Sequence, residues 1–532
     1  MTRKSRRTAV VLGLLLLLAC GWAVYYHFAV DVLPYDDAYI TFRYADRLAS
    51  GKGMTYNDGE RVFGSSSPLY ALWLAGLKRA LPSVPTPVLA VRGNVVFFLL
   101  CTMAMAAVVR SLAGHAAGLA AAALLAAHPS ALSVSGGGME SFLFASLLLA
   151  VVWCCATGRL LAAAALAGLS PLARPEGLLA LLAVPLAWWL AGRPRPLTFT
   201  SLLLLPGCAW AAAATFYYGT LIPHSITAKL APLYLLPPGY SFLSVLIWLG
   251  QWTLPGVTEP APWRDLMSLL LAEAGAIGLL LDAQTRRRGG WLVAVFLNLL
   301  IGFYALTNPM LFDWYTANFF IFWLPSLLVG LPALGRWLAS GRLAWLGPRP
   351  VAVCLAAGVV ASSLGGPYGS DLWWGRSFLE EARSATRLRT IGYRNAALWL
   401  NGLASPSAAS ATVATAETGA FGYYWRGKML DACGLVSPQA LPFLPVPASQ
   451  RPDFRTNPIP LGLLQATRPE YVATLEIFAR TSILDTDWFA RSYKLIGDVP
   501  LPQEIWGSTA VLLFRRVDLP APDARGEAAG TS

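Results

Sequence analysis

Long apolar segments recur along the first two thirds of the chain and limit its fold more than any other feature. In lipid, only helices and closed barrels satisfy every backbone polar group, and these runs are continuous rather than alternating. They therefore predict an α-helical polytopic membrane protein with about eleven transmembrane helices. The runs fall at about 9–30, 86–110, 114–132, 139–157, 159–172, 177–192, 197–217, 265–283, 291–307, 317–335 and 351–366.

The remaining composition supports this fold class. Only 13% of the residues are charged, whereas 56% are hydrophobic, which excludes an ordinary soluble enzyme. The apolar run after MTRKSRR is too long for a signal peptide, so it is expected to be a membrane anchor. Two shorter stretches, Pro68 to Leu81 and Tyr240 to Leu254, lack the ~20 residues that a spanning helix needs. They are expected to be helices at the membrane surface.

The charges predict an orientation. Residues 1–369 hold 24 Lys and Arg against 13 Asp and Glu, while residues 370–532 hold 16 against 15. Because cytoplasmic loops are rich in Lys and Arg, the N-terminus is expected inside and the C-terminal third outside. No basic patch with interleaved aromatic residues occurs, so nucleic acid is not an expected partner. Fourteen basic residues fall at the expected cytoplasmic ends: Arg3, Lys4, Arg6, Arg7, Arg110, Arg159, Arg193, Arg195, Arg286, Arg287, Arg288, Arg336, Arg342 and Arg349.

A change in composition near residue 370 predicts two domains. Residues 1–369 are expected to form the transmembrane domain, with a first outer loop at 31–85, and residues 370–532 an extracytoplasmic α/β domain. In that domain Leu379 to Leu403 has helical periodicity, and a tail from about Pro520 is expected to be disordered. Four runs are short and β-rich: ATVATAE, KMLDACG, PEYVATLE and STAVLLFRR. The cysteines and histidines are too scattered for a disulfide framework or a zinc site.

The first outer loop begins with two adjacent acids, Asp36 and Asp37. Adjacent carboxylates at a bilayer edge repel each other unless a cation, a hydroxyl or helix amides compensate their charge. One of them can then act as a general base. The alternative is that both cap the start of a helix. Apolar residues from Tyr39 to Leu48 recur at helical spacing, which predicts an amphipathic helix in the membrane interface.

This loop also carries a resemblance to a known family. The run DDAYITFRYADRLASGKGMTYNDGERVFGSSSPLYALWLA resembles the first periplasmic loop of GT-C glycosyltransferases, most closely the arabinofuranosyltransferase-like branch. Similar family features follow in order at SGGGMESFLFASLLL, LARPEGLLAL, TLIPHSITAK and ETGAFGYYWRGKMLDACGLVSP, so the resemblance spans most of the chain.

The resemblance implies an enzyme of a bacterial inner membrane. It would transfer a sugar, with inversion, from a polyprenyl-phosphate donor to a glycan, lipid or protein acceptor at the outer face. Arabinofuranose is the sugar of the most similar branch, and another pentose or a hexose remains open. One carboxylate of Asp36 and Asp37 is expected to take the proton from the acceptor hydroxyl, with the choice between them open.

Further residues are predicted to bind substrate. The expected order of spans and the expected orientation place them on the outer side, where they can converge with the acid pair. They are Tyr39 and Arg43 in the first loop, and Glu140, Arg174, Glu176, His224, Lys229, Asp313 and Tyr315 further along.

Each of these assignments has a structural alternative. Arg174 contacts the lipid phosphate or a sugar, or it pairs with Glu176. Glu140 binds substrate or serves a helix start. Lys229 anchors a phosphate or is a solvated loop charge, and His224 is interpreted as a packing or hydrogen-bonding residue rather than a base.

The aromatic positions have alternatives as well. Asp313 and Tyr315 fit a sugar platform, or an aromatic belt at the membrane edge. The C-terminal domain is expected to bind the acceptor glycan or to cover the active site, with Tyr423, Tyr424 and Trp425 as stacking residues.

No cofactor is predicted with a firm site. The loop near Glu140 lacks a second pair of acids, although Asp36 and Asp37 can hold Mg²⁺ or Mn²⁺ loosely through hard oxygen ligands. The rival functions are a lipid or glycan transporter or flippase, and a non-catalytic polysaccharide-binding membrane protein. Transporters place ionisable residues near the midplane and contain repeats. The expected spans contain only Glu273 as an internal acid and no repeat, which favours the enzyme.

Overall fold

The computed structural model describes residues 3–192, 196–230, 233–253, 262–340, 385–404 and 407–519. The expected span at 351–366 and the expected tail from Pro520 lie outside these residues. The chain forms two compact units, each assembled from distant segments. The membrane unit comprises Met1–Val32, Val91–Trp210 and Pro238–Ala382, and the sheet unit comprises Leu33–Ala90, Ala211–Pro237 and Arg383–Ser532.

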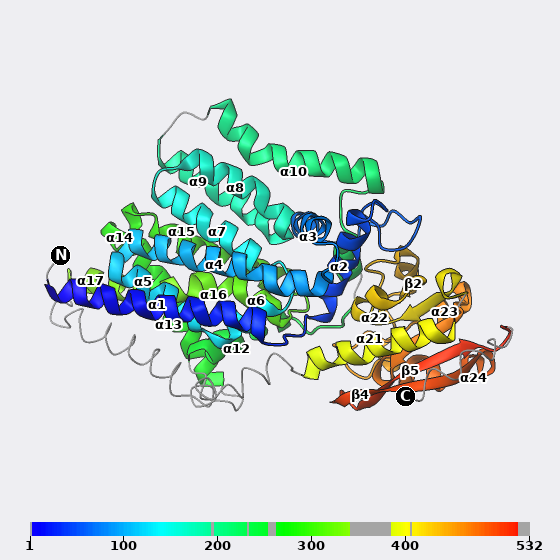
Figure 1. Ribbon diagram of the computed structural model, residues 1–532. Helices are drawn as coiled ribbons and strands as arrows, with labels where there is room; N and C mark the ends of the chain where they lie inside the picture. The colour runs from blue at the N-terminus through cyan, green and yellow to red at the C-terminus, as the bar shows by residue number, and fades with distance from the viewer. Residues whose placement is uncertain are drawn as a thin grey trace. The chain divides into compact units, whose positions relative to one another are not determined.

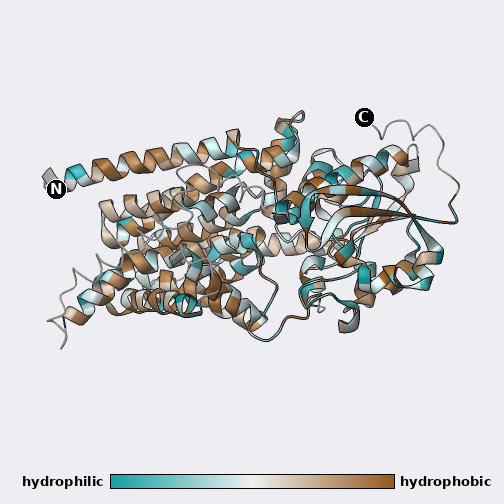
Figure 2. Ribbon diagram, turned by 90° about the horizontal axis from the view of Figure 1, so that it is seen from below, coloured by the Kyte–Doolittle hydropathy of each residue, from teal (hydrophilic) through white to brown (hydrophobic). Residues whose placement is uncertain are grey.

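The membrane unit is helical over its described residues, and Figure 2 shows these helices as predominantly hydrophobic. Its helices are α1 (Arg3–Ala29), α4 (Thr86–Ala113), α5 (His115–Ala127), α6 (Pro129–Gly136), α7 (Ser141–Ala156), α8 (Leu160–Ala173), α9 (Leu178–Leu190), α10 (Leu197–Tyr218), α12 (Tyr240–Thr253), α13 (Pro262–Leu281), α14 (Ala283–Arg287), α15 (Gly290–Thr307), α16 (Thr316–Pro325) and α17 (Leu331–Ala339). Short 3₁₀ turns occur at Pro175–Gly177 and Asp313–Tyr315, and a π-helical turn at Ser326–Gly330. Helices α4 and α10 each extend across the division between the units.

Several of these helices can cross a bilayer, so the protein is a multi-pass membrane protein. Among the described residues, five segments are long and apolar enough: Arg6–Ala29, Thr86–Ala113, Leu197–Tyr218, Gly290–Thr307 and Asp313–Ala339. A sixth arises if α5 and α6, bent by 59°, form one broken span. Pro129 explains the bend, because proline lacks the N–H that would continue the helix. The expected count of eleven remains a prediction.

The two short apolar stretches also form helices. α3 (Pro68–Ala80) has 13 residues and α12 has 14. At ~1.5 Å per residue each is about 20 Å long, which is less than the ~30 Å hydrocarbon core. Their expected place at the membrane surface remains a prediction.

The sheet unit combines Leu33–Ala90 and Ala211–Pro237 with the C-terminal part of the chain (Figure 1). Its helices are α2 (Asp36–Ala49), α3, α11 (His224–Leu230), α21 (Ala385–Leu403), α22 (Gly419–Tyr424), α23 (Leu461–Thr467) and α24 (Asp487–Ser492). Its strands are β1 (Thr412–Thr415), β2 (Lys428–Asp431), β3 (Tyr471–Leu475), β4 (Tyr493–Ile505) and β5 (Ser508–Arg516).

The five strands form one sheet in the order β2-β1-β3-β5-β4. β1 is parallel to β2 and to β3, whereas β5 is antiparallel to β3 and to β4. Helix α21 packs against β4 and β5. The four β-rich runs predicted from the sequence are β1, β2, β3 and β5. The expected helix at Leu379 to Leu403 corresponds to α21 over its described residues.

Helix α2 is present where the apolar spacing predicts it, but its burial is not confined to one face. Nine of its 14 residues are buried, because α3 and α22 both pack against it. An amphipathic surface helix would leave its polar face in water. α2 is therefore a central helix of the sheet unit, and its expected place in the membrane interface remains a prediction.

Candidate active site

Asp36 begins α2, yet it does not cap that helix, whose N-cap position is occupied by Tyr35. Its two carboxylate oxygens accept hydrogen bonds from the backbone N–H groups of Gly419 (3.1 Å) and Ala420 (2.8 Å) at the start of α22. A side chain at Gly419 would collide with Asp36, which explains why glycine stands there. Asp36 therefore caps a helix far away in the sequence, rather than its own.

The environment of Asp36 is nearly closed to solvent. The residue is 5% exposed. Burial raises the pKa of the Asp36 carboxyl and outweighs the lowering by Arg389 and by the two hydrogen bonds. Each oxygen accepts one backbone N–H and the residue is buried, so Asp36 is less accessible to a substrate than Asp37.

Arg43, two helical turns along α2, holds the opposite end of α22. Its guanidinium donates to the carbonyl oxygens of Gly422, Trp425 (3.3 Å) and Gly427 (3.2 Å). Its Nε donates to the carbonyl of Tyr56 at 2.8 Å. An acid at the start of a helix and a cation at its end both complement the helix dipole. The contacts of Arg43 are those of a clamp on α22, not of a group held open for a ligand.

Tyr39 lies between these two clamps and is 5% exposed. Its ring contacts those of Phe42, Tyr423 and Tyr424 at centroid separations of 5.2, 5.6 and 6.0 Å. The Tyr423 hydroxyl donates to Asp46 at 2.7 Å. The aromatic residues predicted to bind sugar, Tyr39 and Tyr423 among them, thus pack α2 against α22.

Asp37 differs from Asp36 in its burial and in its hydrogen bonds. It is only partly buried, and its carboxylate makes no hydrogen bond or ion pair with another described residue. Arg389 on α21 supplies positive charge to this region and pairs with Glu417 at 3.1 Å. Burial lowers the pKa of Arg389, but the carboxylates of Glu417, Asp36 and Asp37 together raise it above its usual value.

Glu417 follows β1 and completes the cluster. Burial raises the pKa of Glu417 to about 8, Arg389 opposes this shift, and the charges of Asp36 and Asp37 add to it. Glu417 therefore exchanges its proton near neutral pH. Neither Arg389 nor Glu417 was predicted from the sequence.

The membrane unit contains a second buried cluster around Arg174. Its Nη1 donates to Glu140 at 2.6 Å, and its Nη2 and Nε donate to Glu176 at 2.9 and 3.3 Å. The guanidinium carbon lies 4.4 Å from the ring centre of Tyr315, and the hydroxyl of Tyr304 donates to Glu176. These side chains are almost completely buried. The pairing of Arg174 with Glu176, weighed as the alternative to a substrate contact, is present, and Glu140 joins it.

The local backbone explains how Arg174 reaches these partners. Residues before proline avoid the helical region, and Arg174 precedes Pro175. It ends α8 in an extended conformation (φ −155°, ψ 147°). The side chain is thus directed away from the helix that carries it.

The remaining predicted residues are distributed over both units. The backbone N–H of His224 donates to Phe63 at 2.7 Å at the start of α11, and Lys229 lies half-buried in the last turn of that helix. Asp313 is exposed at the start of a 3₁₀ turn in the membrane unit. Two groups therefore assemble, one around Arg174 and one around Asp36. Their convergence on a single site remains a prediction.

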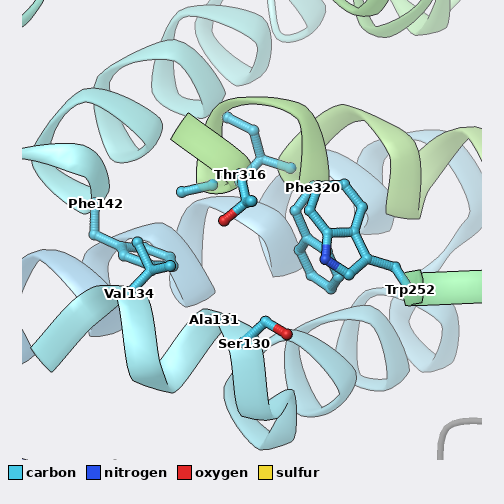
Figure 3. A pocket seen from close by; sticks show the side chains of 9 residues that line it. Ser130, Ala131, Val134, Phe142, Trp252, Thr316 and Phe320 are labelled. Carbon is cyan, nitrogen blue, oxygen red and sulfur yellow. The ribbon is translucent and has the colours of Figure 1, made fainter. Parts of the chain in front are cut away.

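The membrane unit also contains a small apolar pocket between α6, α7, α12 and α16 (Figure 3). Val134, Phe142, Trp252 and Phe320 provide most of its wall, together with the Thr316 side chain. None of its lining residues is ionisable. The pocket has room for little more than a water-sized group, and it holds no acid or base.

Few of the described side chains are arranged to bind a metal ion together. The described residues contain no group of three or more His, Cys, Asp and Glu side chains that could share one. Both oxygens of Asp36 accept N–H groups, so a loosely held Mg²⁺ or Mn²⁺ at the acid pair would depend on Asp37 alone.

Comparison with known proteins identifies solved structures with a similar architecture. Residues 381–514 match a family described as a domain of unknown function, DUF8728. No curated protein matches the chain in sequence. ArnT from Cupriavidus metallidurans is similar in its apo state (TM-score 0.56, 14% identity, 95% of this chain and 99% of that chain) and bound to undecaprenyl phosphate (0.54, 12%, 97% and 99%). The apo oligosaccharyltransferase from Archaeoglobus fulgidus is also similar (0.52, 12%, 87% and 69%).

The chain has the GT-C fold. The fold class implied by the resemblance of the first loop is thereby confirmed, as are the polytopic helical part and the small C-terminal sheet. At identities of 12–14%, the GT-C fold is what these comparisons establish, and the chemistry has to be argued from the residues.

Proposed function

We propose that this protein is an inverting glycosyltransferase that moves a sugar from a polyprenyl-phosphate donor to a glycan, lipid or protein acceptor at the outer face of a bacterial inner membrane. The GT-C fold supports this, because it is shared with a protein that was solved bound to undecaprenyl phosphate. Arabinofuranose is the first sugar to test.

One observation supports the proposal most strongly: two adjacent acids have unequal environments. Asp36 is buried and accepts two backbone hydrogen bonds, whereas Asp37 is partly exposed and has no described partner. A general base needs an accessible oxygen within reach of the proton that it removes. We therefore assign the base to Asp37, and we assign Asp36 as a positioning residue that joins α2 to α22.

The proposed reaction is a single displacement. The Asp37 carboxylate takes the proton of the acceptor hydroxyl, and the freed oxygen electron pair forms a bond to the anomeric carbon. The bond between that carbon and the phosphate oxygen breaks, and its electron pair leaves with the lipid phosphate. One displacement inverts the anomeric centre and requires one base, unlike the paired carboxylates of a retaining glycosidase. Arg389 compensates the negative charge that the clustered acids bring together.

The test uses the full-length protein with a panel of polyprenyl-phosphate sugars, starting with arabinofuranose and including mannose. Released lipid phosphate and glycosylated product are measured. We expect Asp37→Asn to lower kcat by ~10²–10⁴, the usual contribution of a general base. The matched control is Asp58→Asn, an exposed acid of the same loop, which should retain activity. Wild-type turnover by Asp37→Asn would remove the assignment and favour a transporter or a binding protein.

A further inference from the structure

Trp506 at the tip of the β4–β5 hairpin adopts a conformation that tryptophan rarely takes. The turn consists of Trp506 and Gly507, with φ values of 52° and 77°, and Ile505 pairs with Ser508 across it. Two-residue turns with positive φ at both positions favour Asn-Gly. A bulky residue with positive φ is an outlier that often marks a functional position. The identity of residue 506 is therefore not explained by the turn.

The indole of Trp506 lies at the surface and is not packed into the core. The residue is 46% exposed. Its ring has an edge contact with Phe478 at a centroid separation of 6.1 Å, and the guanidinium carbon of Arg389 lies 4.9 Å from its centre. The indole is therefore accessible to a ligand, and it lies beside a guanidinium.

Arg389 connects this surface with the acids of the candidate active site. The same guanidinium pairs with Glu417, and the charges of Asp36 and Asp37 act on it. The ion pair leaves Arg389 Nε and Glu417 Oε2 buried without a hydrogen-bond partner among the described residues. A buried donor or acceptor without a partner is unfavourable. Both atoms are closed to solvent, so Arg389 contributes to this surface through its contact with the indole face and not through Nε.

We propose that Trp506 is a stacking platform for a sugar ring of the acceptor, beside Arg389. The C–H groups on one face of a sugar ring are attracted to the negative face of an indole. The acceptor is the occupant because the base removes a proton from the acceptor, and Arg389 links Trp506 to the acids. This inference rests on the proposed function and adds the element that binds its acceptor.

The hairpin turn provides a sharp test, because asparagine fits the backbone better than tryptophan does. Trp506→Asn should unfold at the same or a higher temperature than the wild type, while the KM for the acceptor rises about tenfold and the KM for the donor is unchanged. Trp506→Phe keeps a π face and should lie near the wild type. Unchanged acceptor KM in Trp506→Asn, or an equal loss in Trp506→Phe, would overturn the platform.

Binding without turnover separates this inference from the assignment of the base. Saturation-transfer NMR with methyl arabinofuranoside, methyl mannoside and short oligosaccharides of each is recorded on the wild type, Asp37→Asn and Trp506→Asn. Binding retained by Asp37→Asn and lost by Trp506→Asn supports the platform. If Asp37→Asn also transfers sugar normally, the base assignment falls while the platform stands. Binding that Trp506→Asn retains at wild-type level contradicts the platform.

Discussion

An arginine among carboxylates occurs in each compact unit, and the two clusters differ in how completely they are paired. In the membrane unit, Arg174 donates to Glu140 and Glu176 and lies over Tyr315. In the sheet unit, the described ion pair of Arg389 is with Glu417, and the charges of two further acids act on it. The first cluster is closed and suits a structural role. The second contains one acid, Asp37, that makes no hydrogen bond or ion pair with another described residue.

The largest expected effect separates the two arginines by stability. Arg174→Met leaves two buried carboxylates without their cation, so unfolding should become easier by ~3–5 kcal/mol. Arg389→Met should cost less, because Glu417, whose pKa burial raises to about 8, can take up a proton and become neutral. Thermal unfolding of the purified full-length variants measures both.

The matched control for this pair is Arg426→Met, an exposed arginine whose side chain should contribute within about 0.5 kcal/mol. Equal losses for Arg174→Met and Arg389→Met would show that the sheet-unit cluster is as tightly closed as the other.

A second prediction separates Asp36 from Asp37. Asp36→Ala removes both acceptors of the α22 N–H groups and should destabilise the protein by ~1–2 kcal/mol, as the loss of a helix cap does. Asp37→Ala removes no described bond and should stay within about 0.5 kcal/mol, while it abolishes transfer. Unfolding and turnover measured on the same samples distinguish the two roles. The reverse pattern, with Asp37→Ala unstable and Asp36→Ala inactive but stable, would exchange the assignments.

A third prediction is a pH dependence of stability. The pKa of Glu417 is about 8 in the folded protein, against an ordinary value near 4.5. Between pH 4.5 and 8 the folded protein therefore binds more protons than the unfolded chain, and stability falls as the pH rises through this window. Glu417→Gln cannot ionise, so its melting temperature should fall less over the same range.

The control for this measurement is Glu476→Gln, an exposed acid of the same unit, which should follow the wild-type curve. Parallel curves for the wild type and Glu417→Gln would show that Glu417 does not exchange its proton in this range.

Local pattern was sufficient for much of the sheet unit. Strands β1, β2, β3 and β5 are short β-rich runs, and each was predicted. The missing strand is β4, whose sequence YKLIGDVPLPQEI contains Pro500 and Pro502. Proline argues against a central strand but is tolerated at a sheet edge, and β4 is an edge strand. Which strand lies at the edge is not visible in the sequence of that strand.

The candidate site was predictable only in part. Asp36 and Asp37 were found because adjacent acids repel each other and demand compensation. Arg389 and Glu417 carry no such local signal: Arg389 is one of several arginines on α21, and Glu417 is a single acid after a short strand. Tyr39 and Arg43 were assigned to substrate because spacing reveals that they share a helix, not what covers it.

The sequence by itself determined the membrane character and the acid pair, because apolar length and charge repulsion act between neighbours along the chain. Tertiary structure decided which acid accepts backbone N–H groups and which stays partly exposed. The N–H groups that occupy Asp36 lie 383 and 384 residues away, and they reach it only because α22 packs on α2. A carboxylate becomes a cap or a base according to the donors around it, and those donors are brought together by folding.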